Sequence, residues 1–233
     1  MRLIAKHSKE DRIKYISHLD MMRTFQRAIR RAALPVAFTQ GFSPHPKIAF
    51  ASALPVGLTS EGEYLDIIME SDIEPEEFDA RLNFASPSGI KIMQSAKIDP
   101  KHPSLMSVIE RASYRIFMPV FVEELTERTE AFLNQPYVLV TKEKSDTMQY
   151  VNIRPLIHWV KLNSSDVSEQ TLDVMLNSGS KSNLKPQIFA DALLDFLKVD
   201  RKFFNHKIHR LDMFLVRNEK LVTPLDLVEF ISI

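Results

Sequence analysis

The side chains best suited to chemistry lie in one stretch, YISHLDMMRTFQRAIRRAALPVAFTQGFSPHPKIAF, residues 15–50. His18 and His45 can exchange protons near neutral pH or donate hydrogen bonds to phosphate, so each is a candidate general acid or base. A metal site needs three or more ligands in a defined geometry. On a helix His18 and Asp20 project about 200° apart and cannot readily share one ion. We therefore predict no metal site here. We also expect no cofactor.

A group of arginines follows the first histidine at the three- and four-residue spacing that places side chains on one side of a helix. The group consists of Arg23, Arg27, Arg30 and Arg31. Guanidinium groups bind phosphate bidentately and stack on bases, so this side is a candidate nucleic-acid-binding surface. The alternative is a solvated helix face, or one neutralised by Glu61, Glu63 and Asp66.

The segment TQGFSPHPK, residues 39–47, reads as a preorganised loop. Gly41 permits a positive φ, and the two prolines restrict the backbone. The candidate binding residues here are Phe42, Ser43, His45 and Lys47. Phe42 and His45 offer flat surfaces on which bases can stack. The alternative is a rigid connector that packs Phe42 into the core.

Charge is unevenly distributed, although the formal net charge is zero. Residues 1–60 carry ten Lys/Arg against three Asp/Glu, whereas residues 61–98 carry three against nine. A basic face attracts phosphate. The two patches could equally pair with each other inside the molecule.

The elements that position these residues can be read from the local signals. Ser17 and Asp20 have the spacing of a capping box, which predicts a helix from Ser17. It should end near Leu34 because Pro35 disfavours the helical conformation in its predecessor. Strands are predicted at residues 2–7, 47–56, 62–70 and 89–98, and a second helix at 74–85. The order strand, helix, strand, strand, helix, strand is the split βαβ, or ferredoxin-like, pattern.

Residues 99–104, DPKHPS, read as a linker, and a similar alternation of strands and helices follows. We therefore predict an α+β protein of two tandem ferredoxin-like units, at residues 1–98 and 111–233. The second unit is the more elaborated one.

The run ISHLD, FQRAIRRAALPVA, QGFSPHPKIAFASALPVG and SEGEYLDI resembles the radical SAM-linked uncharacterised protein family, a domain of unknown function. Weaker matches continue through NIRPLI and GSKSNLKP. At Ala33 and Ser43 the family more often has Gly and Asn. The resemblance implies a radical SAM protein of the cobalamin-binding kind as partner, and its genomic setting implies RNA as the polyanion.

Composition narrows the class of protein. The chain contains no cysteine, which excludes disulfides, a thiol nucleophile and a Cys-ligated zinc or iron–sulfur centre. No apolar run approaches the roughly 20 residues that cross a bilayer. The charged N-terminus lacks an apolar signal-peptide core. We expect no membrane association and a cytoplasmic location.

These features predict an RNA-binding accessory module, not itself an enzyme, that presents tRNA or ribosomal RNA to a radical SAM partner. One alternative is a metal-independent RNA-processing nuclease in which His18 or His45 moves the proton. Another is a protein-interaction adaptor for the radical SAM subunit that uses the acidic segment 61–72.

Overall fold

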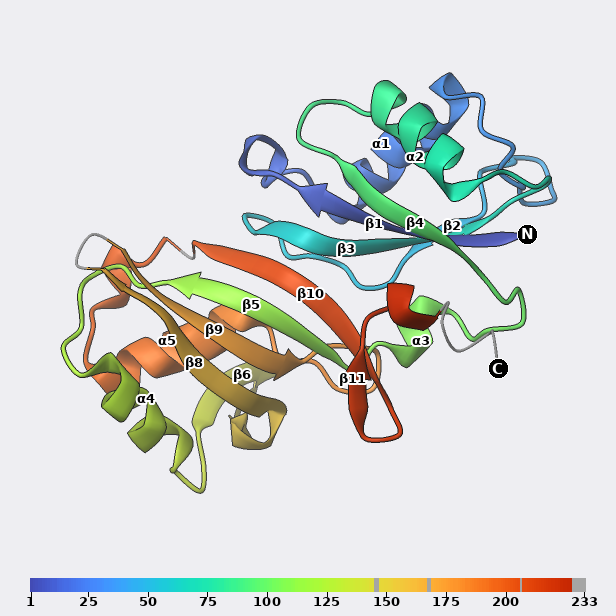
Figure 1. The fold of residues 1–233 in the computed structure, drawn as a ribbon. Helices are drawn as coiled ribbons and strands as arrows, with labels where there is room; N and C mark the ends of the chain where they lie inside the picture. Colours follow the sequence, from blue (N-terminus) through green and yellow to red (C-terminus); the bar gives the residue numbers. More distant parts are fainter. Residues whose placement is uncertain (145–146, 167–168, 206, 228–233) are drawn as a thin grey trace. The chain divides into compact units, whose positions relative to one another are not determined.

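The computed structural model describes residues 1–144, 147–166, 169–205 and 207–227, and they form an α+β protein (Figure 1). The chain divides into two compact units. The first comprises Met1–Glu110 and the residues from Asp212 onward, and the second comprises Arg111–Leu211. None of the helices in the described ranges is long and apolar enough to span a membrane.

The unit boundaries differ from the predicted domains 1–98 and 111–233, because residues from Asp212 group with the first unit. Side-chain contacts explain this grouping. Lys6 Nζ lies 2.7 Å from Asp212 Oδ2, and the Tyr64 hydroxyl donates to Asp212 Oδ1 at 2.7 Å. Such contacts over more than 140 residues cannot be seen in local sequence patterns.

The first unit contains the predicted order of elements. These are β1 (Arg2–Lys9), α1 (His18–Arg31), β2 (Ile48–Phe50), β3 (Thr59–Ile68), α2 (Pro75–Ala85) and β4 (Ile92–Ile98), followed by α3 (Leu105–Val108). β1 lies between β3 and β4, and β2 pairs with the other edge of β3, all antiparallel. The strand order is therefore β4-β1-β3-β2. β2 covers only three residues of the strand predicted at 47–56.

Both long helices of this unit lie on the same face of its sheet (Figure 1). Alternate residues of the strands point toward them, as the two-residue period of a strand requires. The core comprises Leu3 and Ala5 of β1, Leu65 and Ile67 of β3, Ile92 of β4, Met21, Phe25, Ala28 and Ile29 of α1, and Phe78 and Leu82 of α2.

The predicted ends of α1 are found with one difference. The Ser17 hydroxyl accepts from the Asp20 amide at 3.2 Å, as a cap should. The Asp20 carboxylate does not return to the Ser17 amide; it accepts from the Ser17 hydroxyl at 2.8 Å. This bond is the main reason that the pKa of Asp20 is lowered. The helix ends at Arg31, and Ala33 takes a left-handed φ of 48° before Pro35.

The second unit adds a separate hairpin to its sheet and helices. Its elements are β5 (Arg111–Phe117), α4 (Leu125–Leu133), β6 (Leu139–Lys144), β7 (Thr147–Asn152), β8 (Ile157–Asp166), β9 (Glu169–Asn177) and α5 (Pro186–Leu197). β9 lies between β5 and β8, both antiparallel to it, and β6 and β7 form a separate hairpin. β10 (Ile208–Arg217) has residues in both units, and β11 (Lys220–Val222) pairs with its end.

Candidate functional site

The four arginines of α1 lie on the side of the helix that faces away from the core, and all are exposed. We call Arg23, Arg27, Arg30 and Arg31 the α1 arginine face. The buried residues of the same helix lie between them in the sequence and on its other side; they are Met21, Phe25, Ala28 and Ile29. The burial of these apolar residues therefore orients the guanidinium groups outward.

Few of these arginines are neutralised. Arg23 pairs with Asp20 at 3.2 Å, one turn earlier on the same helix. Arg27 donates to the Thr24 hydroxyl at 3.4 Å, and Arg31 to the Ala85 carbonyl at 2.6 Å. Within the described part of the chain, the Arg30 guanidinium has no hydrogen-bond or ion-pair partner. The face thus keeps most of its positive charge.

The acidic segment pairs elsewhere. Asp66 is buried with Arg2, and Lys97 lies 3.2 Å from Asp72 and 2.8 Å from Glu74. In the described ranges, no arginine of the α1 arginine face forms an ion pair with Glu61, Glu63 or Asp66. Neutralisation of the face by the β3 carboxylates is therefore not observed.

The 39–47 loop is closed by its own contacts. The Thr39 amide donates to the His45 carbonyl at 2.9 Å, and the His45 amide donates to the Thr39 hydroxyl at 3.1 Å. His45 Nδ1 lies 3.2 Å from both the Thr39 hydroxyl and the Ser43 carbonyl. Gly41 has a φ of 123°, a conformation that favours glycine. Phe42 is fully exposed, so it does not pack into the core.

The predicted site residues are not all joined. In the described ranges no hydrogen bond or ion pair connects the 39–47 loop with the α1 arginine face, or His18 with His45. His18 packs edge-on against Phe50, with ring centroids 5.0 Å apart. The structure therefore presents the arginines, the loop and His18 as three separate features of the first unit.

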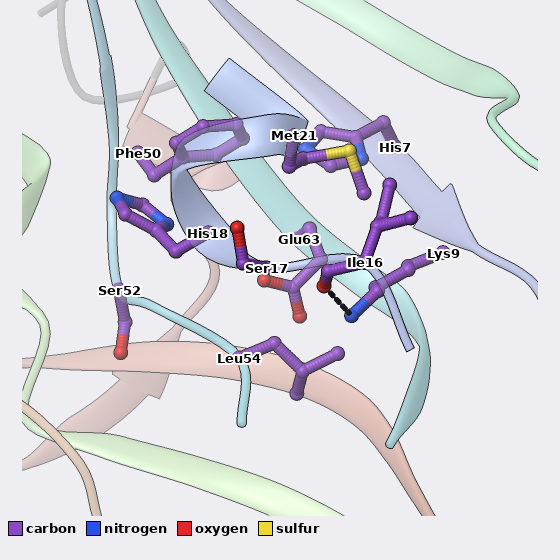
Figure 2. A pocket seen from close by; sticks show the side chains of 10 residues that line it. All are labelled: His7, Lys9, Ile16, Ser17, His18, Met21, Phe50, Ser52, Leu54 and Glu63. Carbon is purple, nitrogen blue, oxygen red and sulfur yellow. Dashed lines mark hydrogen bonds between the residues drawn. The ribbon is translucent and has the colours of Figure 1, made fainter. Parts of the chain in front are cut away.

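A fourth feature is a small pocket beneath the first turn of α1, shown in Figure 2. Its cavity volume is about 20 Å³. It is lined by His7, Lys9, Ile16, Ser17, His18, Met21, Phe50, Ser52, Leu54 and Glu63. Three ionisable side chains in this set, those of His7, Lys9 and Glu63, are at most 4% exposed. We call these three residues the buried triad.

The strands explain why the buried triad converges. Leu3, Ala5, His7 and Lys9 alternate along β1, and the last two continue the inward-facing side of the strand. His7 lies directly opposite Glu63 in the register of β1 with β3. The side of the sheet that is apolar under the middle of α1 therefore becomes ionisable under its first turn.

His7 is held by both backbone and rings. Its Nδ1 lies 3.1 Å from the Ser8 carbonyl, and its ring lies 4.7 Å from Phe25 and 5.8 Å from Phe50. Desolvation by burial lowers the pKa of His7, against a smaller opposing effect of Glu63. Lys9 Nζ donates to the carbonyls of Lys14 at 2.9 Å and Ile16 at 3.3 Å.

This burial predicts a pH dependence of stability. Unfolded His7 takes up a proton near its ordinary pKa of 6.5, whereas the folded state resists protonation. The contribution of the neutral His7 ring to the unfolding free energy is thus complete above pH 6.5. It is lost as the pH falls toward the lower pKa of the folded state, and the unfolding free energy then changes by at most about 1.4 kcal/mol per pH unit. We expect His7→Phe to have an unfolding free energy that depends less on pH below pH 6.5 than that of wild type. Urea denaturation over a pH series measures this. His45→Phe, at an exposed histidine, is the control; an equal slope in wild type and His7→Phe would contradict the prediction.

The buried triad is not among the site residues predicted from the sequence. One signal could have found it: at inward positions of β1 the period-two pattern Leu3, Ala5 continues as His7 and Lys9. Ionisable residues at positions that the pattern marks as core are expected at functional sites.

A known protein family matches most of this chain. The family described as "Uncharacterized protein conserved in bacteria (DUF2344)" matches residues 2–186, which include the α1 arginine face, the 39–47 loop and the buried triad. No curated protein matches the chain. Because the match covers well over half of its residues, the chain belongs to this bacterial family.

Proposed function

We propose that the first unit is an RNA-binding module that uses the α1 arginine face. The observation that carries this proposal is four exposed guanidinium groups on one helix, of which Arg23 alone has a carboxylate partner among the described residues. Phosphate is the ligand that such a group of arginines binds best. When the arginines bind the phosphates of a nucleic acid, they also release its counterions, which favours binding.

The 39–47 loop supports single-stranded RNA as the form that is bound. Phe42 is fully exposed on a loop that is closed by Thr39 and His45. An exposed aromatic ring on such a loop offers a base-stacking surface without a large loss of conformational freedom. Exposed Phe42 contributes no burial of apolar area to the stability of the fold, so its ring is available to a ligand.

The finer part of the proposal is that the protein presents tRNA or ribosomal RNA to a radical SAM partner in the cytoplasm. It is supported only by the family resemblance of residues 15–67. We also infer that both units are ferredoxin-like. The strand orders β4-β1-β3-β2 and β10-β5-β9-β8 support that inference, as do two long helices in each unit, α1 and α2 in the first and α4 and α5 in the second.

The test replaces Arg27, Arg30 and Arg31 together by Glu. We expect the affinity for single-stranded RNA to fall at least about tenfold, and the slope of log K against log salt to fall by about two in magnitude. Fluorescence anisotropy over a salt series measures both. The matched control replaces the exposed Lys142, Lys161 and Lys220 by Glu, which changes the net charge equally. Unchanged RNA binding in the arginine variant would refute the proposal.

A further inference from the structure

The buried triad places three ionisable side chains at the end of a layer that is otherwise apolar. Burying ionisable side chains such as those of Lys9 and Glu63 has a desolvation cost, and well-packed apolar residues at such positions often leave a protein equally or more stable. The same side of β1 already carries Leu3 and Ala5, so apolar packing is available in this layer. Packing therefore does not require the polar end of the layer, and one atom in it, His7 Nε2, points to a ligand.

Hydrogen-bond accounting shows what the ligand must supply. The Ser8 carbonyl near His7 Nδ1 can only accept, so the proton of the neutral ring lies on Nδ1. His7 Nε2 then presents a lone pair. This atom is buried and has no hydrogen-bond partner among the described residues. An unmet acceptor of this kind is costly, and it calls for a group that donates.

The size and the lining of the pocket restrict which chemical groups can bind in it. A cavity volume of about 20 Å³ holds about one water-sized atom with its hydrogens. One basic side chain, Lys9, and one acidic side chain, Glu63, line the pocket together, so neither sign of ligand charge is favoured and a neutral group fits it best (Figure 2). Phosphate and a whole nucleobase are too large. A hydroxyl group fits, because it is small, neutral, and both donates and accepts.

We propose that the pocket takes a ribose hydroxyl of bound RNA, with His7 Nε2 as its acceptor. This inference rests on the RNA-binding function proposed above. The two sites share one helix, since Ser17 and His18 line the pocket at the start of α1 and the arginines follow on its outer face. His18 is exposed beside the buried groups, and its imidazole can contact the same sugar or its phosphate. The 2′-hydroxyl is the group by which a protein distinguishes RNA from DNA.

The first experiment compares affinities for RNA, DNA and 2′-O-methyl RNA of one sequence. We expect wild type to prefer RNA over both by about fivefold, as one hydrogen bond allows. His7→Phe should remove the preference and leave the salt dependence intact. His158→Phe, in the second unit, is the matched control and should keep the preference. Equal binding of the three oligonucleotides by wild type overturns this inference alone, whereas absence of all binding overturns the RNA-binding proposal as well.

The second experiment needs no variant. In wild type labelled with ¹⁵N in histidine, the Nε2 resonance of His7 should move on addition of RNA and stay in place on addition of the same DNA sequence. An Nε2 resonance that is unchanged by saturating RNA means that the pocket holds only water, and it overturns the inference.

Discussion

Replacing Asp66 by Asn is expected to lower the unfolding free energy of the first unit by about 3–5 kcal/mol, because it leaves a buried guanidinium without its counter-charge. Arg2 and Asp66 are 5% and 8% exposed. Arg2 Nε donates to Asp66 Oδ1 at 2.8 Å and Nη2 donates to Oδ2 at 2.7 Å, a bidentate pair. Arg2 Nη2 also donates to the Pro103 carbonyl at 3.0 Å, which connects β1, β3 and the segment before α3.

Urea unfolding followed by far-ultraviolet circular dichroism measures this effect. Asp72→Asn is the matched control, because Asp72 is exposed and its partner Lys97 keeps Glu74. Exposed pairs contribute between 0 and about 1 kcal/mol, so this control should remain close to wild type. A loss of less than about 1 kcal/mol in Asp66→Asn would show that Arg2 needs no counter-charge, contrary to the account in terms of burial.

A second large effect is expected from Phe25→Ala, which should cost about 3–5 kcal/mol of stability. Phe25 is fully buried in α1, and its ring lies 4.7 Å from His7 and 5.6 Å from Phe50. The substitution removes apolar burial and leaves a cavity beside the buried triad. The pocket should therefore loosen as well, and the Nε2 resonance of His7 reports that change directly.

Phe84→Ala is the control for this prediction. Phe84 also lies in a helix, α2, but its side chain is 97% exposed. Any gain in helix propensity on going from Phe to Ala is common to the two variants, so their difference isolates the loss of packing. The same urea unfolding experiment compares them. If both variants had equal stability, the core contacts of Phe25 would contribute nothing.

Local signals predicted α1 well because the interactions that set its limits lie within a few residues. Ser17 caps the amide of Asp20, three residues on, and Pro35 follows the left-handed turn at Ala33. Local signals did not show which apolar residues of α1 are covered. Leu19 is 65% exposed, whereas Met21 and Ala28 are buried, because packing against the sheet decides this.

Among the candidate site residues, sequence spacing predicted that the arginines share one side of a helix, and the structure shows them there. The partners of the acidic segment could not be predicted. Arg2 with Asp66 and His7 with Glu63 are each brought together by the register of β1 with β3. That register depends on which faces bury apolar area across more than 50 residues.

The sequence by itself determined the order of elements in the first unit, the capped start of α1, the outward spacing of its arginines and the absence of any cysteine chemistry. These follow from composition and from interactions a few residues long. Only the tertiary structure decided that Asp66 pairs with Arg2, that Phe42 is exposed to solvent, and that residues from Asp212 belong to the first unit. It also decided that His7, Lys9 and Glu63 share one pocket, because strand pairing, which brings distant residues into contact, is set by burial over the whole unit.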